Sequence, residues 1–166
     1  VIKLGSGYNI GIAEKKIKKL ELVSKYESIY TPPIKSVPKK NLPNVSILSF
    51  GGTISSKVDY RTGGVYAAYS AEDFVQMIPE LKNVANLRTE QVMKIMSEDM
   101  APEHWQAMAE SIASELNKGE VAGVVVTQGT DTLHFSTAAM SFFLRNLNKP
   151  VVFTAAQRSI DRGSSD

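Results

Sequence analysis

Two glycine-threonine turns constrain this chain most, because each one directly follows a run of strand-forming residues. Residues 51–53 (Gly-Gly-Thr) follow the apolar run 45–50, and residues 128–132 (Gln-Gly-Thr-Asp-Thr) follow the run 123–127. Short apolar runs that end in turn residues are typical of buried strands in a parallel sheet. Ligands of open α/β sheets bind outside the carboxyl ends of such strands. We therefore expect two hydroxyls and the Asp131 carboxylate to line one pocket for a small polar substrate.

A purely structural role for these turns stays open, because glycine accepts positive φ without steric cost and is common in tight turns. The phosphate-binding patterns G-x-x-x-x-G-K-[ST] and G-x-G-x-x-G are absent from the sequence, so a nucleotide cradle is not indicated. Repetition favours a functional role, since the same strand, glycine and threonine element occurs twice.

Composition limits the remaining classes of function. The chain has 166 residues, 43% of them hydrophobic, which suits one domain or a small module plus part of a larger one. Because cysteine is absent, disulfides, thiol catalysis and cysteine-ligated zinc are excluded, and two histidines make a histidine triad or metal cluster unfavourable. No apolar run approaches the ~18 residues of a membrane helix and no signal peptide is visible, so we expect a cytoplasmic protein without membrane attachment.

The net charge of +2 is unevenly distributed, with eight lysines between residues 15 and 40. These lysines can contact a phosphate backbone, or they can simply be solvated and discourage edge-to-edge aggregation. The sequence does not separate the two interpretations.

Three regions follow from turn residues and prolines. Residues 1–30, with a hairpin pattern in 1–12 and a further strand pattern from Ile17 to Val23, are typical of the end of a small N-terminal β module. Residues 31–43 hold four prolines and three lysines and are expected to form an extended linker. Residues 44–166 are expected to form the first part of an α/β domain, and we expect the chain to be an internal portion of a longer protein.

Within 44–166 the periodicity predicts alternating strands and helices, which indicates a doubly wound, mostly parallel sheet with right-handed crossovers. The predicted strands are 45–50, 84–87, 92–96, 122–127 and 151–155, and the predicted helices are 70–79, 102–119 and 132–147.

Thr53 is the best candidate nucleophile, although a threonine hydroxyl needs a base or a charge network to activate it. Tyr60 lies seven residues further on, in a polar loop, and could fold over the site and relay a proton. An ordinary loop aromatic is the alternative for Tyr60.

The second turn and a third strand end supply candidate binding groups. The Asp131 carboxylate suits an α-ammonium group, because charge-assisted hydrogen bonds are strong, and Thr130 can act as a second hydroxyl. Ser97 and Glu98 follow another strand and can hold a substrate carboxylate and ammonium. A polar loop before a helix is the alternative for this pair.

Four segments, in this order and spacing, resemble the bacterial-type asparaginase family. They are Phe50-Gly51-Gly52-Thr53-Ile54, Ser97-Glu98-Asp99-Met100, Gln128-Gly129-Thr130-Asp131-Thr132 and Val151-Val152-Phe153-Thr154-Ala155-Ala156-Gln157-Arg158. Residues 56–64 and 156–166 are similar, within that family, to the D subunits of archaeal-type glutamyl-tRNA(Gln) amidotransferases. Those proteins also carry an N-terminal β-barrel, and residues 7–12 resemble its final strands.

The resemblance implies threonine-based hydrolysis of glutamine, with the released ammonia passed to a partner, the amidotransferase E subunit, that uses ATP and magnesium to convert Glu-tRNA(Gln) to Gln-tRNA(Gln). It implies no cofactor or metal in this chain, and a homodimer within a heterotetramer. Carried over by position, the catalytic residues are Thr53, Tyr60, Thr130 and Asp131, and the substrate-binding residues are Gly52, Ser97, Glu98, Gly129 and Ala155.

The sequence departs from the family pattern at two points. Gln128 stands where the family usually has histidine. In addition, the family has a catalytic lysine well downstream of the threonine that matches Thr130, whereas no lysine follows Lys149 in this sequence. We therefore expect the 166-residue chain alone to be inactive. A free-standing asparaginase and a non-catalytic interaction fragment stay open as alternatives.

Overall fold

The computed structural model describes residues 2–3, 9–21, 38–58, 65–67 and 79–158. Tyr60 and residues 70–78 of the helix predicted at 70–79 lie outside these ranges.

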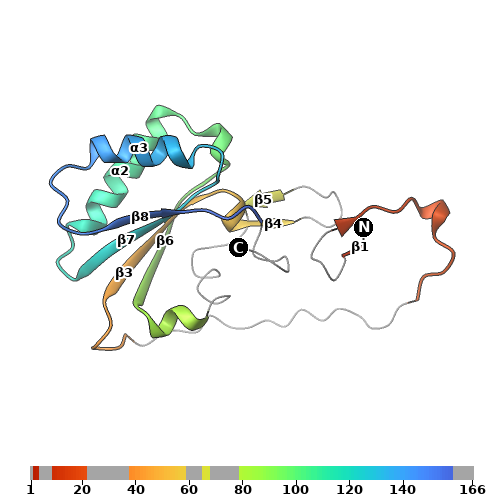
Figure 1. Ribbon diagram of the computed structural model, residues 1–166, viewed down its shortest axis with the longest axis horizontal. Helices are drawn as coiled ribbons and strands as arrows, with labels where there is room; N and C mark the ends of the chain where they lie inside the picture. Colours follow the sequence, from red (N-terminus) through yellow and green to blue (C-terminus); the bar gives the residue numbers. More distant parts are fainter. Residues whose placement is uncertain (1, 4–8, 22–37, 59–64, 68–78, 159–166) are drawn as a thin grey trace.

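Within the described residues, the centre of the fold is a four-stranded parallel sheet (Figure 1). Its strands are β3 (Asn44–Gly51), β6 (Asn86–Ile95), β7 (Val121–Thr127) and β8 (Val151–Thr154), in the spatial order β6-β3-β7-β8. Every neighbouring pair is parallel. The predicted α/β class and parallel sheet are therefore confirmed.

The helices α2 (Pro102–Leu116) and α3 (Leu133–Phe143) cover one face of the sheet (Figure 1). Pro102 begins α2, where the missing N–H of proline costs no helical hydrogen bond. The crossovers from β6 to β7 and from β7 to β8 run in the same direction across the sheet. Because both crossovers are right-handed, both helices must lie on the same face.

The connection from β3 to β6 runs the other way across the sheet and must therefore cross the opposite face. Its last part contains the short 3-10 helix η3 (Pro79–Asn83). Leu81 and Val84 line an apolar cavity of about 380 Å³ together with Val45 and Ile47 of β3. The described end of the connection, from residue 79 onwards, thus packs on the face away from the helices, as a doubly wound sheet requires.

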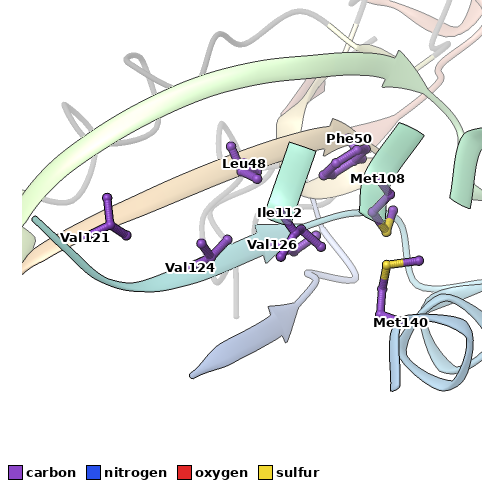
Figure 2. Close-up of a cluster of buried hydrophobic side chains, with 8 residues drawn as sticks. All are labelled: Leu48, Phe50, Met108, Ile112, Val121, Val124, Val126 and Met140. Atoms are coloured by element: carbon purple, nitrogen blue, oxygen red, sulfur yellow. The ribbon is translucent and has the colours of Figure 1, made fainter. Parts of the chain in front are cut away.

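The core between the sheet and the helices follows the alternation of side chains along β3 (Figure 2). Leu48 and Phe50 point towards Met108 and Ile112 of α2, and all four are at most 1% exposed. Val121, Val124, Val126 and Met140 complete this cluster. Burial of such side chains is the main stabilising term, at roughly 1.5–3 kcal/mol each.

Several smaller elements lie outside the sheet. The antiparallel pair β1 (Ile2–Lys3) and β2 (Asn9–Ile10) confirms the hairpin predicted in residues 1–12, and η1 spans Glu14–Lys16. A second antiparallel pair consists of β4 (Ser56–Val58) and β5 (Val65–Ala67). The strand predicted from Ile17 is wrong over residues 17–21, which form no strand and are exposed; Leu22 and Val23 lie outside the described residues.

Two predicted boundaries are also wrong. The strands predicted at 84–87 and 92–96 are one strand, β6, which runs unbroken from Asn86 to Ile95. Strand β6 lies at the edge of the sheet, where polar residues between the apolar ones are tolerated. Helix α3 ends at Phe143 rather than near 147, because Leu144 is extended and Asn146 adopts a positive φ of 55° as the chain turns back towards β8.

The end of the predicted linker is tied to β6 through Asn86. The Asn86 side-chain amide donates to the carbonyls of Lys39 and Leu42, at 2.9 and 3.1 Å. Its oxygen accepts the Lys39 backbone N–H at 2.8 Å. These bonds fix the path by which the chain enters β3.

Candidate active site

The two glycine-threonine turns lie at the point where the strand order reverses. From β3 the chain moves to β6 on one side, and it then crosses to β7 and β8 on the other side. The carboxyl ends of β3 and β7 are therefore adjacent at a topological switch point. This is where ligands bind in doubly wound folds.

The first turn requires glycine at residue 52. Gly52 has φ 78° and ψ −178°, a conformation that is essentially reserved for glycine. A Cβ on Gly52 would overlap the backbone N of Gly129 and lie 2.8 Å from the Gln128 carbonyl carbon. The two predicted glycine turns thus touch through their main chains, and no side chain fits between them.

Thr53 begins the 3-10 helix η2 (Thr53–Ser55) directly after this contact, and its side chain is half-buried. The turn before it is held by the Gly52 carbonyl, which accepts the Ser55 N–H at 3.0 Å and the Ser56 hydroxyl at 2.6 Å. The Gly52 N–H donates to the Ile95 carbonyl of β6 at 3.0 Å. The residue before Thr53 is therefore held by hydrogen bonds through both its carbonyl and its N–H.

Ser97 joins the third strand end to the second turn. It is 2% exposed and begins the 3-10 helix η4 (Ser97–Asp99) after β6. Its hydroxyl donates to Asp131 Oδ2 at 3.2 Å and accepts the Asp131 backbone N–H at 3.1 Å. Gly129 leaves room for this contact, because a Cβ there would lie 2.5 Å from the Ser97 Oγ.

Gln128 and Thr132 flank the second turn and add further bonds. The Gln128 backbone N–H donates to the Thr154 carbonyl of β8 at 3.3 Å, which places the end of β8 and the adjoining Ala155 beside the turn. The Gln128 Nε2 donates to Thr132 Oγ1 at 3.2 Å, and Thr132 Oγ1 donates to the Ser97 carbonyl at 2.8 Å.

The structure therefore brings together most of the predicted site. The ends of the strands that carry Thr53, Ser97, Thr130 and Ala155 converge, and Thr53, Thr130 and Ala155 are half-buried. In the described part of the chain, the Thr53 and Thr130 hydroxyls make no hydrogen bond, which leaves them available to a substrate.

The predicted acidic residues have different environments. Asp131 is exposed but held by Ser97, whereas Glu98 is exposed and has no ion-pair partner among the described residues. Tyr60, the remaining predicted catalytic residue, lies outside the described ranges.

Three residues of the site were missed by reasoning from sequence. Ser55 and Ser56 support the first turn, and Thr132 links the second turn to Ser97. The signal was available for each, because Ser55 and Ser56 follow Thr53 closely and Thr132 completes the Gly-Thr-Asp-Thr run.

Both histidines have partners outside the two turns. His104 Nδ1 accepts the Ala101 N–H at 3.0 Å at the start of α2, and the exposed His134 packs its ring on Phe135, with ring centroids 4.0 Å apart. Among the residues that the structure describes, no group of three His, Cys, Asp or Glu side chains is arranged to hold a metal ion. Within the same ranges, no helix combines the length and apolarity needed to cross a membrane.

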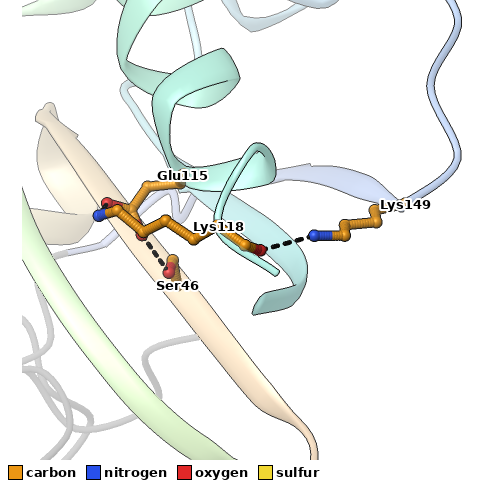
Figure 3. A network of polar contacts seen from close by, with 4 residues as sticks. All are labelled: Ser46, Glu115, Lys118 and Lys149. Atoms are coloured by element: carbon orange, nitrogen blue, oxygen red, sulfur yellow. Dashed lines mark hydrogen bonds and ion pairs between the residues drawn. The ribbon is translucent and has the colours of Figure 1, made fainter. Parts of the chain in front are cut away.

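A buried carboxylate lies between α2 and the sheet, away from the turns (Figure 3). Glu115 of α2 is 3% exposed, accepts a hydrogen bond from the Ser46 hydroxyl at 2.6 Å and forms an ion pair with Lys118. Burial raises the pKa of Glu115, but the hydrogen bonds from Lys118 and Ser46 outweigh burial, and the pKa lies below its ordinary value. Lys149 donates to the Leu116 and Lys118 carbonyls, both at 2.7 Å, and so satisfies carbonyl groups at the C-terminal end of α2. We assign this network a structural role.

Comparison with known proteins defines the class. The family model "Asparaginase, N-terminal" matches residues 44–166, which is most of the chain. A solved structure, the thermostable L-asparaginase from Thermococcus kodakarensis, superposes with a TM-score of 0.66 at 31% identity, over 74% of this chain and 37% of that one. This chain therefore belongs to the asparaginase family, which confirms the resemblance of its motifs.

Curated relatives narrow the comparison. The chain is 48% identical over 168 residues to the D subunit of glutamyl-tRNA(Gln) amidotransferase from Pyrococcus furiosus, a match that covers 100% of this chain and 38% of that protein. It is 43% identical over 168 residues to the protein of the same name from Methanococcus maripaludis, covering 100% of this chain and 40% of that protein. The chain thus spans 38 to 40% of the length of these curated relatives.

Proposed function

We propose that the protein, at its natural full length, is the glutamine-hydrolysing subunit of a tRNA-dependent amidotransferase that converts Glu-tRNA(Gln) to Gln-tRNA(Gln). The observation that carries the proposal is the contact of Gly52 with Gly129 at the switch point, which brings the Thr53 and Thr130 turns together. The similarity to amidotransferase D subunits along the entire chain, residues 1–43 included, supports this function.

The proposed chemistry is covalent amide hydrolysis. The Thr53 hydroxyl attacks the side-chain amide carbon of glutamine, ammonia leaves, and water then hydrolyses the resulting ester to release glutamate. Thr130 acts as the second hydroxyl of the proton relay, and Tyr60 exchanges protons with Thr53. These steps need no cofactor or metal in this chain.

Substrate binding uses the residues around the turns. The Asp131 carboxylate pairs with the α-ammonium group of glutamine, and its orientation is set by Ser97, which is itself too buried to offer much surface to a substrate. Glu98 is exposed and faces the solvent at the same strand end. Main-chain groups of Gly52, Gly129 and Ala155 line the rest of the pocket.

We further propose that the ammonia passes to a second protein, the amidotransferase E subunit, which activates Glu-tRNA(Gln) with ATP and magnesium. The same proposal places the protein in the cytoplasm, as a homodimer within a heterotetramer. The names of the curated relatives support a role in such a complex.

A free-standing L-asparaginase is the second candidate, and the fold similarity to the Thermococcus kodakarensis asparaginase favours it. The N-terminal segment distinguishes the two candidates. That structural match covers 74% of this chain, whereas the match to the amidotransferase D subunits covers 100% of it.

The test is release of ammonia from glutamine and from asparagine by the protein at its natural full length, with and without the partner protein and Glu-tRNA(Gln). Glutamine turnover that rises when the partner and the charged tRNA are added supports the amidotransferase. Strong asparagine turnover by the protein alone supports the asparaginase and refutes the proposal.

A further inference from the structure

A chain of side-chain hydrogen bonds runs behind the candidate site, from Gln128 through Thr132 to Ser97. Gln128 Nε2 lies 3.2 Å from Thr132 Oγ1, and Thr132 Oγ1 lies 2.8 Å from the Ser97 carbonyl. The Ser97 hydroxyl in turn holds the main chain and the carboxylate of Asp131. Gln128 is thus connected to Asp131 both through the main chain and through this second path.

The direction of the bonds fixes which group Gln128 must supply. A threonine hydroxyl has one proton, and Thr132 gives it to the Ser97 carbonyl, which can only accept. Thr132 Oγ1 can therefore only accept from Gln128, so the atom facing it must be the Nε2 donor. An acceptor in that position, such as a carboxylate, would break the chain of bonds.

The orientation of the amide leaves the other end of the side chain without a partner. Gln128 is 0% exposed, and its Oε1 has no hydrogen-bond donor among the described residues. Buried polar atoms are nearly always paired, and an exception calls for an explanation. A residue kept only for packing would gain from an apolar side chain of the same size, so the bond made by Nε2 is what favours glutamine here.

We infer that Gln128 is a positioning residue, whose Nε2 donor holds Thr132 against the Ser97 carbonyl and so sets the Ser97 hydroxyl on Asp131. The inference deepens the proposed function and rests on it for its kinetic consequence. Gln128 does not touch the substrate; it acts through Thr132 and Ser97. Loss of the donor lets the Asp131 carboxylate move, and small displacements of a substrate-holding group can reduce turnover by up to about 100-fold.

The experiment compares Gln128→Met and Gln128→His in the protein at its natural full length, with glutamine turnover as the first readout. Methionine conserves the volume and removes the donor, whereas histidine restores an N–H donor in either protonation state. Gln106→Met is the matched control, because it removes the same kind of donor from an exposed helix pair with Glu110. We expect kcat/KM to fall at least about tenfold in Gln128→Met, to recover at least in part in Gln128→His, and to stay unchanged in Gln106→Met.

The second readout is hydrogen exchange of the Asp131 amide, which does not depend on activity. We expect faster exchange at Asp131 in Gln128→Met, with unchanged protection in the core strands β3 and β7. Thr132→Val removes the other end of the same bond and carries the test if Gln128→Met does not fold. The double variant should be no worse than Thr132→Val alone, because both changes break one path.

The outcomes separate the two proposals. Wild-type turnover together with wild-type exchange in both Gln128→Met and Thr132→Val overturns the positioning role, as does full additivity of the two changes. If the wild-type protein hydrolyses no amide, the proposed function fails, and the exchange rate at Asp131 still decides whether Gln128 positions the turn.

Discussion

The Ser97 hydroxyl holds Asp131 twice: it donates to Oδ2 at 3.2 Å and accepts the backbone N–H at 3.1 Å. Ser97 follows β6 and Asp131 follows β7, two strands that do not pair with each other but both flank β3. One buried serine therefore sets the position of an exposed carboxylate across the carboxyl end of the sheet.

Replacing Ser97 with alanine removes both of these bonds. We expect Ser97→Ala to raise KM for glutamine about tenfold, because a charge-assisted bond to an exposed carboxylate is worth roughly 1.4 kcal/mol. Steady-state ammonia release measures this effect. Ser111→Ala is the control, since the Ser111 hydroxyl donates to the Ala107 carbonyl within α2, away from the turns. An equal KM in Ser97→Ala and this control would contradict the role of Ser97.

Gly52→Ala tests the contact between the two turns. The added Cβ would overlap the Gly129 backbone and force a conformation that alanine avoids, so we expect a loss of about 3 kcal/mol or more in the free energy of unfolding and loss of turnover. Gly119→Ala is the matched control, because a Cβ there meets nothing within 4 Å and Gly119 has no positive φ. Urea denaturation of both variants measures the difference, and similar stabilities would show that the turns do not touch.

Glu115 makes stability depend on pH in the acidic range. Its pKa is lower in the folded protein than the ordinary value of 4.5, so the unfolded chain binds the proton more readily. The stabilisation is therefore complete above that value and is lost as the pH falls through the lowered pKa. We expect Glu115→Gln to be less stable than wild type at pH 7 and the gap to narrow towards pH 3.

Chemical denaturation across this range measures the gap. Glu110→Gln, on the exposed side of the same helix, is the control. A gap of constant size from pH 3 to pH 7 would contradict the account of Glu115.

A side-chain hydrogen bond joins α2 to α3. Trp105 Nε1 donates to the Ser136 hydroxyl at 2.8 Å, and Ser136 is fully buried. We expect Trp105→Phe to lower the free energy of unfolding by about 1–3 kcal/mol, because it leaves the Ser136 hydroxyl unpaired and removes part of the packing. A double-mutant cycle with Ser136→Ala isolates the bond, and strictly additive losses would show that the bond contributes nothing.

The central strands and the meeting of the two glycine-threonine turns could be predicted from sequence because their signals are local. The runs 45–50 and 122–127 are largely apolar, as strands buried on both faces require, and β3 and β7 occupy these positions. The glycine-threonine turns marked their carboxyl ends. The parallel order of the strands then placed Thr53 and Thr130 together without any knowledge of side-chain contacts.

The remaining features depend on tertiary contacts. The sequence pattern predicts two strands where β6 is one, because the polar residues Arg88 to Gln91 at its centre disrupt the apolar pattern. Only the place of β6 at the edge of the sheet makes one long strand favourable. The apolar residues Leu144 and Leu147 extend the helical pattern beyond α3, although the chain must turn there to reach β8. The bonds from Ser97 to Asp131 and from Gln128 to Thr132 join residues whose partners no local pattern specifies.

The central claim is that the two turn threonines carry out amide hydrolysis at one site. It is tested most directly by ammonia release from glutamine by Thr53→Val and Thr130→Val in the protein at its natural full length, with unfolding curves to confirm the fold. Valine keeps the shape and removes only the hydroxyl. We predict that each variant folds and loses turnover by at least about 100-fold; near-wild-type turnover in either variant would contradict the claim.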